Sequence, residues 1–193
     1  MGRTREYDDN AVLTGAMEAF RRKGYVALSI RDLEEATGLK AGSIYNSFGD
    51  KAGLFAAAFS HYNRVVLLRR IAEHAGATAG LAGLRALFLS LLREPNDGSF
   101  GCLITNAAIE FGGCDRPPSG VEEGLRVLSE TLTGRLMSAS SAGTLRAGID
   151  PVLAAMRLAA MYQGILVLVR AGQEKAQLER LINSEFDILE RDR

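Results

Sequence analysis

The apolar residues near the N-terminus recur at the spacing of an α-helix. One apolar stripe is formed by positions i, i+3, i+4 and i+7, which here are Leu13, Ala16, Met17 and Phe20. Three basic residues follow, and Gly24 then interrupts the pattern, as is usual at a helix C-terminus. The pattern therefore predicts a first amphipathic helix that ends before Gly24.

Two short helices are predicted next. The first begins at Ser29, because Asp32 three residues later gives a near match to a capping box, and Gly38 ends it after about two turns. The second runs from about Ala41 to Phe48. Two short helices joined by a glycine-containing turn are typical of a helix-turn-helix. The same spacing also occurs in helix pairs that only pack together. Spacing alone therefore does not decide between DNA binding and packing.

The rest of the chain also follows helical patterns. Asp50 is a good N-cap for a long fourth helix, and the segment 73–83, rich in Ala and Gly, predicts a loop. Asp150 followed by Pro151 is a strong helix start. We expect further helices at about 81–93, 99–112, 119–141, 151–172 and 175–190. These patterns predict an all-α protein.

Composition supports a folded protein and limits arguments from charge. The chain has 193 residues, of which 47% are hydrophobic, so it can bury a substantial core. Lys and Arg total 23, as do Asp and Glu, and the net charge is zero. A general polyanion binder is usually basic. Any contact with nucleic acid must therefore depend on where the charges are placed.

The sequence gives no sign of export or of a membrane partner. The charged first residues are not followed by the apolar stretch of a signal peptide. The most apolar segment, Leu158 to Val169, is shorter than the about 20 residues that a bilayer requires. If Cys102 and Cys114 share one helix, they lie roughly 18 Å apart along it, too far for a disulfide. We therefore expect a cytoplasmic protein.

In a helix-turn-helix the first helix braces the second, which enters the major groove of DNA. The expected bracing residues are Ile30, Leu33, Leu39, Ile44 and Phe48. The expected outward residues of the second helix are Lys40, Ala41, Ser43, Tyr45, Asn46 and Ser47. These side chains are mostly small, polar or planar, and Gly42 between them permits close approach of the backbone to DNA.

The stretch GYVALSIRDLEEATGLKAGSIYNSFGDKAGLF, residues 24–55, resembles the DNA-binding signature of the tetracycline-repressor (TetR/AcrR) family. The matching runs are Gly24 with Tyr25, Ser29 to Leu33, Gly38 to Phe48, and Lys51 to Phe55. Lys40 stands where the family often has Ser or Thr, and Ser47 where it often has His or Tyr. These two departures concern the phosphate contacts and the operator sequence rather than the fold.

The resemblance implies a DNA contact at Tyr45, through its hydroxyl group, to a phosphate or a base edge. A plain core aromatic is the alternative. At the start of the long helix, the Lys51 ammonium and the free amides can face a phosphate, whereas the alternative is a solvated lysine. The candidate DNA-contacting residues are Ser29, Arg31, Lys40, Ala41, Gly42, Ser43, Tyr45, Asn46, Ser47 and Lys51.

A ligand pocket is expected in the second part of the chain. Asn106 and Glu110 are four residues apart and share a helix face, while Tyr162 and Gln163 interrupt an apolar run. They are either solvated or the few polar groups of a mostly apolar effector pocket. The candidate ligand residues are Phe88, Leu92, Cys102, Asn106, Glu110, Leu128, Tyr162, Gln163 and Leu166.

Cys102 has two interpretations. Free cysteine is usually a small buried hydrophobe. The resemblance also allows a redox or electrophile sensor, although no basic residue lies nearby in the sequence to lower the thiol pKa. Both interpretations stay open.

The last two expected helices are apolar on more than one face, so each must be buried on two sides. The second side packs either in a deeper core or on a second copy of the chain in a symmetric interface. A dimer is favoured because two DNA-reading heads must reach half-sites about 34–36 Å apart, or a multiple of that. The candidate interface residues are Leu158, Met161, Ile165, Leu168, Leu178, Leu181, Ile182, Phe186 and Leu189.

The sequence offers no metal site and no catalytic constellation. His61 and His74 lack a second pair of ligands, and we expect neither a cofactor nor enzymatic activity. The resemblance implies a helix-turn-helix domain over 1–50 and an effector-binding and dimerisation domain over 51–193. We expect a homodimeric repressor that binds a palindromic double-stranded operator and that a small molecule releases. The alternative is a small-molecule carrier on the same fold without specific DNA binding.

Overall fold

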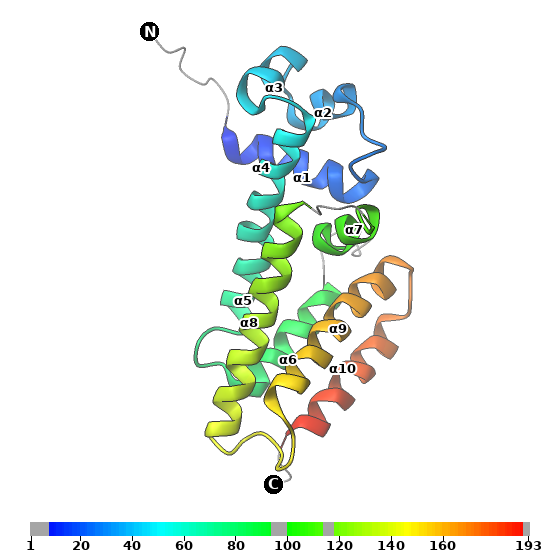
Figure 1. The fold of residues 1–193 in the computed structure, drawn as a ribbon. Helices are drawn as coiled ribbons and strands as arrows, with labels where there is room; N and C mark the ends of the chain where they lie inside the picture. The colour runs from blue at the N-terminus through cyan, green and yellow to red at the C-terminus, as the bar shows by residue number, and fades with distance from the viewer. Residues whose placement is uncertain (1–7, 94–99, 114–117, 191–193) are drawn as a thin grey trace.

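The computed structural model describes residues 8–93, 100–113 and 118–190 (Figure 1). Within these ranges the chain forms helices and no strand, which confirms the predicted all-α class. A small group of N-terminal helices lies at one end of an elongated molecule, and one long helical rod joins it to a larger helical body (Figure 1).

The N-terminal group, called the head below, contains the three helices expected from the sequence. They are α1 (Asp9–Lys23), α2 (Ile30–Thr37) and α3 (Ala41–Phe48). The predicted capping box is present, since Asp32 N donates to Ser29 Oγ at 3.2 Å and Ser29 N donates to Asp32 Oδ2 at 2.9 Å. Local capping therefore accounts for where α2 begins.

The rod that leaves the head changes its helical geometry on the way. It consists of α4 (Lys51–Tyr62), a π-helical turn η1 (Asn63–Leu68) and α5 (Arg69–His74). Asp50 caps α4, as expected, by accepting from Gly53 N at 2.7 Å. The π-helical turn was not predicted, because the apolar spacing was interpreted as one regular helix.

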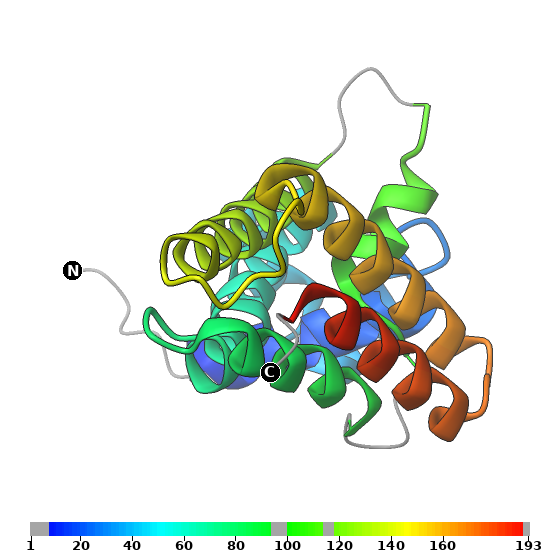
Figure 2. The same ribbon diagram turned by 90° about the horizontal axis from the view of Figure 1, so that it is seen from below.

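The body is built from the remaining helices. They are α6 (Gly80–Ser90) with a 3-10 turn η2 (Leu91–Arg93), α7 (Leu103–Glu110), α8 (Ser119–Ser141), α9 (Pro151–Arg170) and α10 (Lys175–Leu189). Seen from below, α8 lies along α9, and α10 lies along α6 (Figure 2). Asp150 caps α9, as predicted, through Val152 N at 2.8 Å. The region 73–83 is only partly a loop, since α5 ends and α6 begins within it.

An aromatic cluster packs the head onto the rod and the body. The Phe55 ring of α4 lies 4.7 Å from Phe20 of α1 and 5.0 Å from Tyr25, measured between ring centroids. Phe111, just after α7, stacks on Phe55 at 5.9 Å. Full burial of one such ring is worth about 1.5–3 kcal/mol, so this cluster is a major source of stability at the joint.

The structure corrects the expected dimer face. Six of its nine residues are buried inside their own chain, so their side chains are not open to a second copy: Leu158, Ile165, Leu178, Ile182, Phe186 and Leu189. Met161 is half-buried, and Leu168 and Leu181 are exposed. The apolar side chains that do face outward on α9 and α10 are Val152, Leu153, Met156, Val167, Leu168, Leu181 and Ile188.

The length of α9 also corrects an expectation. The helix has 20 residues and, within the described ranges, is the one helix long and apolar enough to cross a bilayer by length and composition. The expectation of too short a segment considered only Leu158 to Val169. However, one face of α9 packs along α8, with Ala155, Leu158 and Ile165 buried there or in the adjoining core. That packing is typical of a core helix.

Candidate nucleic-acid interface and ligand cavity

The second helix of the helix-turn-helix, α3, packs on the core of the head through its apolar side, as expected. Leu33 and Ile44 are fully buried and Leu39 nearly so, while Ile30 and Phe48 are half-buried against the same core. These five apolar side chains fix α3 against α2 and leave the opposite face of α3 on the surface.

The turn between the two helices depends on the carboxylate of Glu34, whose role the sequence pattern does not indicate. Gly38 adopts φ +71°, the left-handed conformation that glycine tolerates best. Lys40 stands at the N-cap of α3, where its ammonium cannot accept a hydrogen bond. Instead, Glu34 of α2 accepts from Ala41 N at 2.7 Å. The spacing of Glu34 and Ala41 does not predict this contact, because it depends on the geometry of the turn between them.

The outward face of α3 has the features that a groove-entering helix needs. The Tyr45 ring is 48% exposed although it is large and mostly apolar. Asn46 and Lys40 are also exposed, and Ala41, Ser43 and Ser47 are half-buried along the same side. No described atom lies within 4 Å of a Cβ built on Gly42. The packing of the protein therefore does not require glycine here, whereas close approach of an outside surface would.

Ser29 and Arg31 lie exposed at the start of α2. The Ser29 hydroxyl donates to Asp32 Oδ2 at 2.6 Å, so its first role is in the capping box. Asp32 also receives the Lys23 ammonium at 2.6 Å, and this contact holds the pKa of the carboxyl well below its usual range. Arg31 remains a candidate for a phosphate contact.

The position of Lys51 corrects the alternative interpretation of a solvated lysine. Its Nζ donates a hydrogen bond to the Leu28 carbonyl oxygen and lies 4.5 Å from the centroid of the Tyr25 ring. The side chain therefore ties the start of α4 to the connection between α1 and α2. The ammonium makes these contacts within the head, and its phosphate contact stays a prediction.

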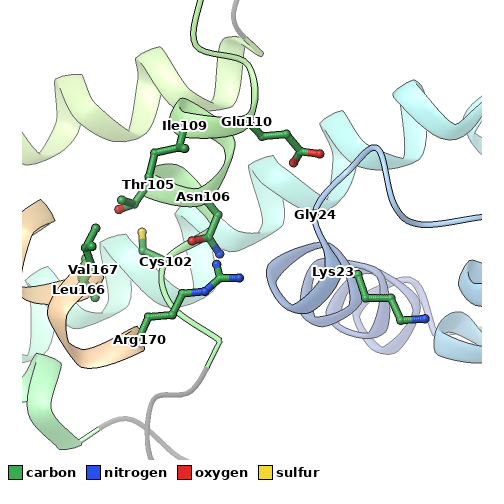
Figure 3. A pocket seen from close by; sticks show the side chains of 10 residues that line it. All are labelled: Lys23, Gly24, Cys102, Thr105, Asn106, Ile109, Glu110, Leu166, Val167 and Arg170. Carbon is green, nitrogen blue, oxygen red and sulfur yellow. The ribbon is translucent and has the colours of Figure 1, made fainter. Parts of the chain in front are cut away.

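A cavity of about 330 Å³ lies where the head meets the body (Figure 3). Lys23 and Gly24 at the end of α1 form one side. Helix α7 and its N-cap residue form another, with Cys102, Thr105, Asn106, Ile109 and Glu110. The last turns of α9 close it with Leu166, Val167 and Arg170. The structure thus brings four of the predicted ligand residues together: Cys102, Asn106, Glu110 and Leu166.

The polar residues of this cavity also connect the head to the body. Glu110 accepts Tyr25 N at 2.8 Å with one carboxylate oxygen and Val26 N at 2.7 Å with the other. We call this pair of bonds the Glu110 clasp. Asn106 Nδ2 donates to Arg21 O at 3.1 Å, and the Arg21 guanidinium donates to Gly101 O at 2.8 Å. The cavity wall and the joint therefore share side chains.

The other predicted ligand residues lie elsewhere, which corrects the expected pocket. Phe88, Leu92, Leu128 and Tyr162 are all buried in the packed core of the body. The rings of Phe88 and Tyr162 meet edge to face at 5.5 Å. Gln163 is half-buried and accepts a hydrogen bond from Thr105 Oγ1 at 2.5 Å. Their helices had been placed correctly, but the depth of each side chain depends on packing that the sequence does not display.

Cys102 is buried in a polar setting. It is 4% exposed, and the Tyr62 hydroxyl donates to its Sγ at 3.3 Å. Burial, together with the nearby thiol, raises the pKa of Tyr62 well above its ordinary value. The Arg21 guanidinium lies 5.5 Å from the Tyr62 ring centroid, so a basic group is near in space although none is near in sequence. Cys114 lies outside the described residues.

Within the described ranges, no group of three or more His, Cys, Asp and Glu side chains is placed to hold a metal ion. The site that stands out is therefore a braced, exposed second helix at one end and a cavity at the joint. Together they define the class of protein: a helix-turn-helix DNA-binding regulator with a helical regulatory body.

Comparison with known proteins identifies the family. The model described as bacterial regulatory proteins, tetR family, matches residues 12–58, and the model described as tetracyclin repressor-like, C-terminal domain, matches residues 80–184. The second match covers more than half of the chain. The chain belongs to the tetracycline-repressor family.

Similar proteins span nearly the whole chain. The HTH-type transcriptional repressor ComR of Escherichia coli K12 is 28% identical over 186 residues, which is 94% of this chain and 87% of ComR. The repressor Rv1474c of Mycobacterium tuberculosis is 26% identical over 174 residues, covering 89% and 87% of the two chains. A cysteine mutant of the TetR family regulator CifR, solved with a 26-base-pair operator DNA, matches in fold with a TM-score of 0.82 at 24% identity, over 97% of this chain and 100% of that chain.

The family membership and these relatives agree on the kind of activity. The protein is a DNA-binding transcriptional regulator, and its known relatives are regulators rather than enzymes.

Proposed function

We propose that this protein is a cytoplasmic repressor that binds a palindromic operator as a homodimer and leaves it when a small molecule occupies the cavity at the joint. The similar proteins ComR and Rv1474c are both repressors, which supports repression over activation. The outward apolar face of α9 and α10 supports a second copy. The side chains shared between cavity and joint support a ligand-dependent head orientation.

The observation that carries this proposal is the outward face of α3. A half-exposed Tyr45 stands beside Gly42, where nothing in the chain fills the space of a side chain. A protein that used α3 only for packing would gain by burying the ring and by replacing glycine, which weakens a helix by about 0.5–1 kcal/mol relative to alanine. Contact with an outside surface explains both features.

The direct test is fluorescence anisotropy with duplexes that tile the DNA beside the protein's own gene, at two salt concentrations. We expect tight, sequence-dependent binding that Tyr45→Ala weakens by about 1–3 kcal/mol, roughly 5- to 150-fold. Met137→Ala is the matched control, since Met137 is 54% exposed and lies on α8 of the body. Equal loss in both variants, or binding without sequence dependence, would contradict the proposed role of α3.

The alternative function, a small-molecule carrier without specific DNA binding, conflicts with the family membership and with the repressors that the chain resembles. The zero net charge of the chain and the internal contacts of Lys51 are the features that would suit a carrier, because both reduce the attraction to phosphates. The two functions differ in salt dependence. A DNA-binding protein loses affinity linearly with the logarithm of salt concentration, with a slope set by the number of phosphates contacted. A carrier would show only weak binding that does not distinguish between duplexes.

A further inference from the structure

The cavity at the joint contains one charge that the protein does not use. Glu110 is committed to two backbone amides of the head, and Lys23 is paired with Asp32. Arg170, in the last turn of α9, also lines the cavity. Among the residues that the structure describes, the Arg170 guanidinium has no hydrogen-bond or ion-pair partner. Figure 3 shows it pointing from α9 toward Asn106 on the facing side of the cavity.

The geometry holds this guanidinium at the cavity. A Cβ built on Gly101 would lie 2.9 Å from Arg170 Cδ and 3.1 Å from Asn106 Oδ1. The stem of Arg170 and the amide of Asn106 therefore converge over Gly101, where a larger residue would push them apart. The amide nitrogen of Asn106 is used by Arg21 O and by Phe100 O at 3.0 Å. Figure 3 shows the amide group of Asn106 next to the guanidinium.

The rest of the lining consists of Cys102, Thr105 and three aliphatic side chains. Leu166 is buried at the wall, while Val167 and Ile109 are 43% and 70% exposed. Exposed aliphatic side chains around one cation favour a ligand with an apolar body and one anionic end. The volume of about 330 Å³ lies near the lower end of the 300–1,000 Å³ that is typical of ligand pockets, so the ligand is small.

We propose that this cavity binds a small organic monocarboxylic acid, with the carboxylate paired to Arg170 and the apolar body against Ile109, Leu166 and Val167. A carboxylate matches the planar fork of a guanidinium and can form two parallel hydrogen bonds with it. A dianionic phosphate fits less well, because its second charge would face the Glu110 carboxylate without another free cation. A cation would meet Arg170 itself.

This inference rests on the proposed function for its consequence in the cell. An acid seated between Arg170 and the end of α1 would contact Lys23 and Gly24 of the head as well as α9 of the body. Its binding energy would therefore differ between orientations of the head. A ligand needs such a difference to change which orientation is populated.

The binding itself is tested without DNA. Isothermal titration calorimetry would compare butyrate, hexanoate, benzoate and phenylacetate with the corresponding primary amides, which have nearly the same shape but no charge. We expect acids to bind at least about tenfold more tightly than their amides. Arg170→Gln should remove this preference, whereas Arg180→Gln, a similar exposed arginine on α10, should keep it. The melting temperatures of both variants show that they are folded.

Three results would overturn the proposal: amides that bind as well as acids, acids that bind Arg170→Gln unchanged, or no binding by any member of the series. The same acids added to an operator complex test the proposed function separately. If an acid binds through Arg170 but leaves operator affinity unchanged, the site stands and the ligand-release step fails. If no acid binds while the operator is held tightly, the regulator stands and this ligand class fails.

Discussion

His61 is a buried imidazole at the contact between the head and the rod. Its Nε2 lies 3.0 Å from Thr14 Oγ1 of α1, and its Nδ1 lies 3.1 Å from Arg64 Nη2. Because a guanidinium can only donate, Nδ1 accepts and Nε2 carries the proton. Burial, and then the charge of Arg64, lower the pKa of His61 below its ordinary value of 6.5. The folded protein therefore keeps this imidazole neutral.

The sign of the resulting pH dependence follows from that shift. The unfolded chain binds a proton at His61 near pH 6.5 and the folded chain only at lower pH, so stability is full above about pH 6.5 and falls as the pH drops below it. Urea unfolding between about pH 5 and pH 8 should show this decline. We expect His61→Gln to flatten it and His74→Gln, which alters the other histidine, to leave it intact. An unchanged slope in His61→Gln would contradict the assignment.

At the residue scale, the sequence predicted local contacts and missed distant ones. The capping roles of Ser29, Asp50 and Asp150 were predictable because each partner lies within three residues. Lys51 and Glu110 bond to backbone groups 23 and 84–85 residues away. Every residue type has a backbone carbonyl, and nearly every one has a backbone amide. The sequence pattern therefore does not show which backbone group a distant side chain will bond.

At the element scale, α8 carries a glycine that packing requires and another that it does not. A Cβ on Gly120 would lie 2.3 Å from Cδ1 and 2.5 Å from Cγ of the Phe59 ring in α4. No described atom lies within 4 Å of a Cβ built on Gly134, in the same helix. Gly120 therefore sets how closely the rod and α8 approach, while Gly134 only weakens the helix.

Replacing each glycine by alanine should give opposite results. Gly120→Ala should destabilise the protein by roughly 1–3 kcal/mol, because Phe59 and the helix must move apart. Gly134→Ala should stabilise it by about 0.5–1 kcal/mol through helix propensity. Chemical denaturation of both variants measures the two effects. A similar change in both would mean that the contact between Gly120 and Phe59 does not limit the helix spacing.

Helix ends were predicted well where capping residues marked them, and the π-helical turn was missed. Most of the ends of α2, α3, α8 and α9 fall within about two residues of the expected positions. In η1, Asn63 and Leu67 are both buried, and Asn63 Nδ2 donates to Gly120 O at 2.9 Å. The hydrogen bonds of a π-helical turn span one residue more than those of an α-helix, and a short apolar run cannot distinguish the two spacings.

At the scale of the whole molecule, the outward apolar face of α9 and α10 leads to a prediction about assembly. Met156 is 64% exposed on this face, and Gly164 lies further along α9 with no described atom near its absent side chain. Met156→Glu should yield a folded monomer in analytical ultracentrifugation and weaken operator binding by roughly tenfold or more, since two linked heads no longer act together. Met137→Glu, which introduces the same carboxylate on α8, should have the assembly state and operator affinity of the wild type.

A monomeric wild-type protein, or a dimer that tolerates Met156→Glu, would place the interface elsewhere. The sequence could indicate that α9 and α10 are buried on two sides. It could not indicate which side packs within its own chain and which faces outward. Leu158 and Met156 are only two residues apart, yet one is fully buried and the other mostly exposed. In a helix that is apolar nearly all round, only the packing of neighbouring helices decides this.

The Glu110 clasp has a consequence for how such regulators can be recombined. Its partners are main-chain amides of residues 25 and 26, so the bond does not depend on which side chains the head presents. Its one strict demand is at Gly24, where φ is +80° and a Cβ would lie 3.0 Å from Glu110 Oε2. A head from another regulator, grafted with glycine at that position and with the equivalents of Phe20, Arg21 and Tyr25, would make the same contacts with the rod and the body. Operator preference could then be exchanged between proteins while the body keeps its own ligand response.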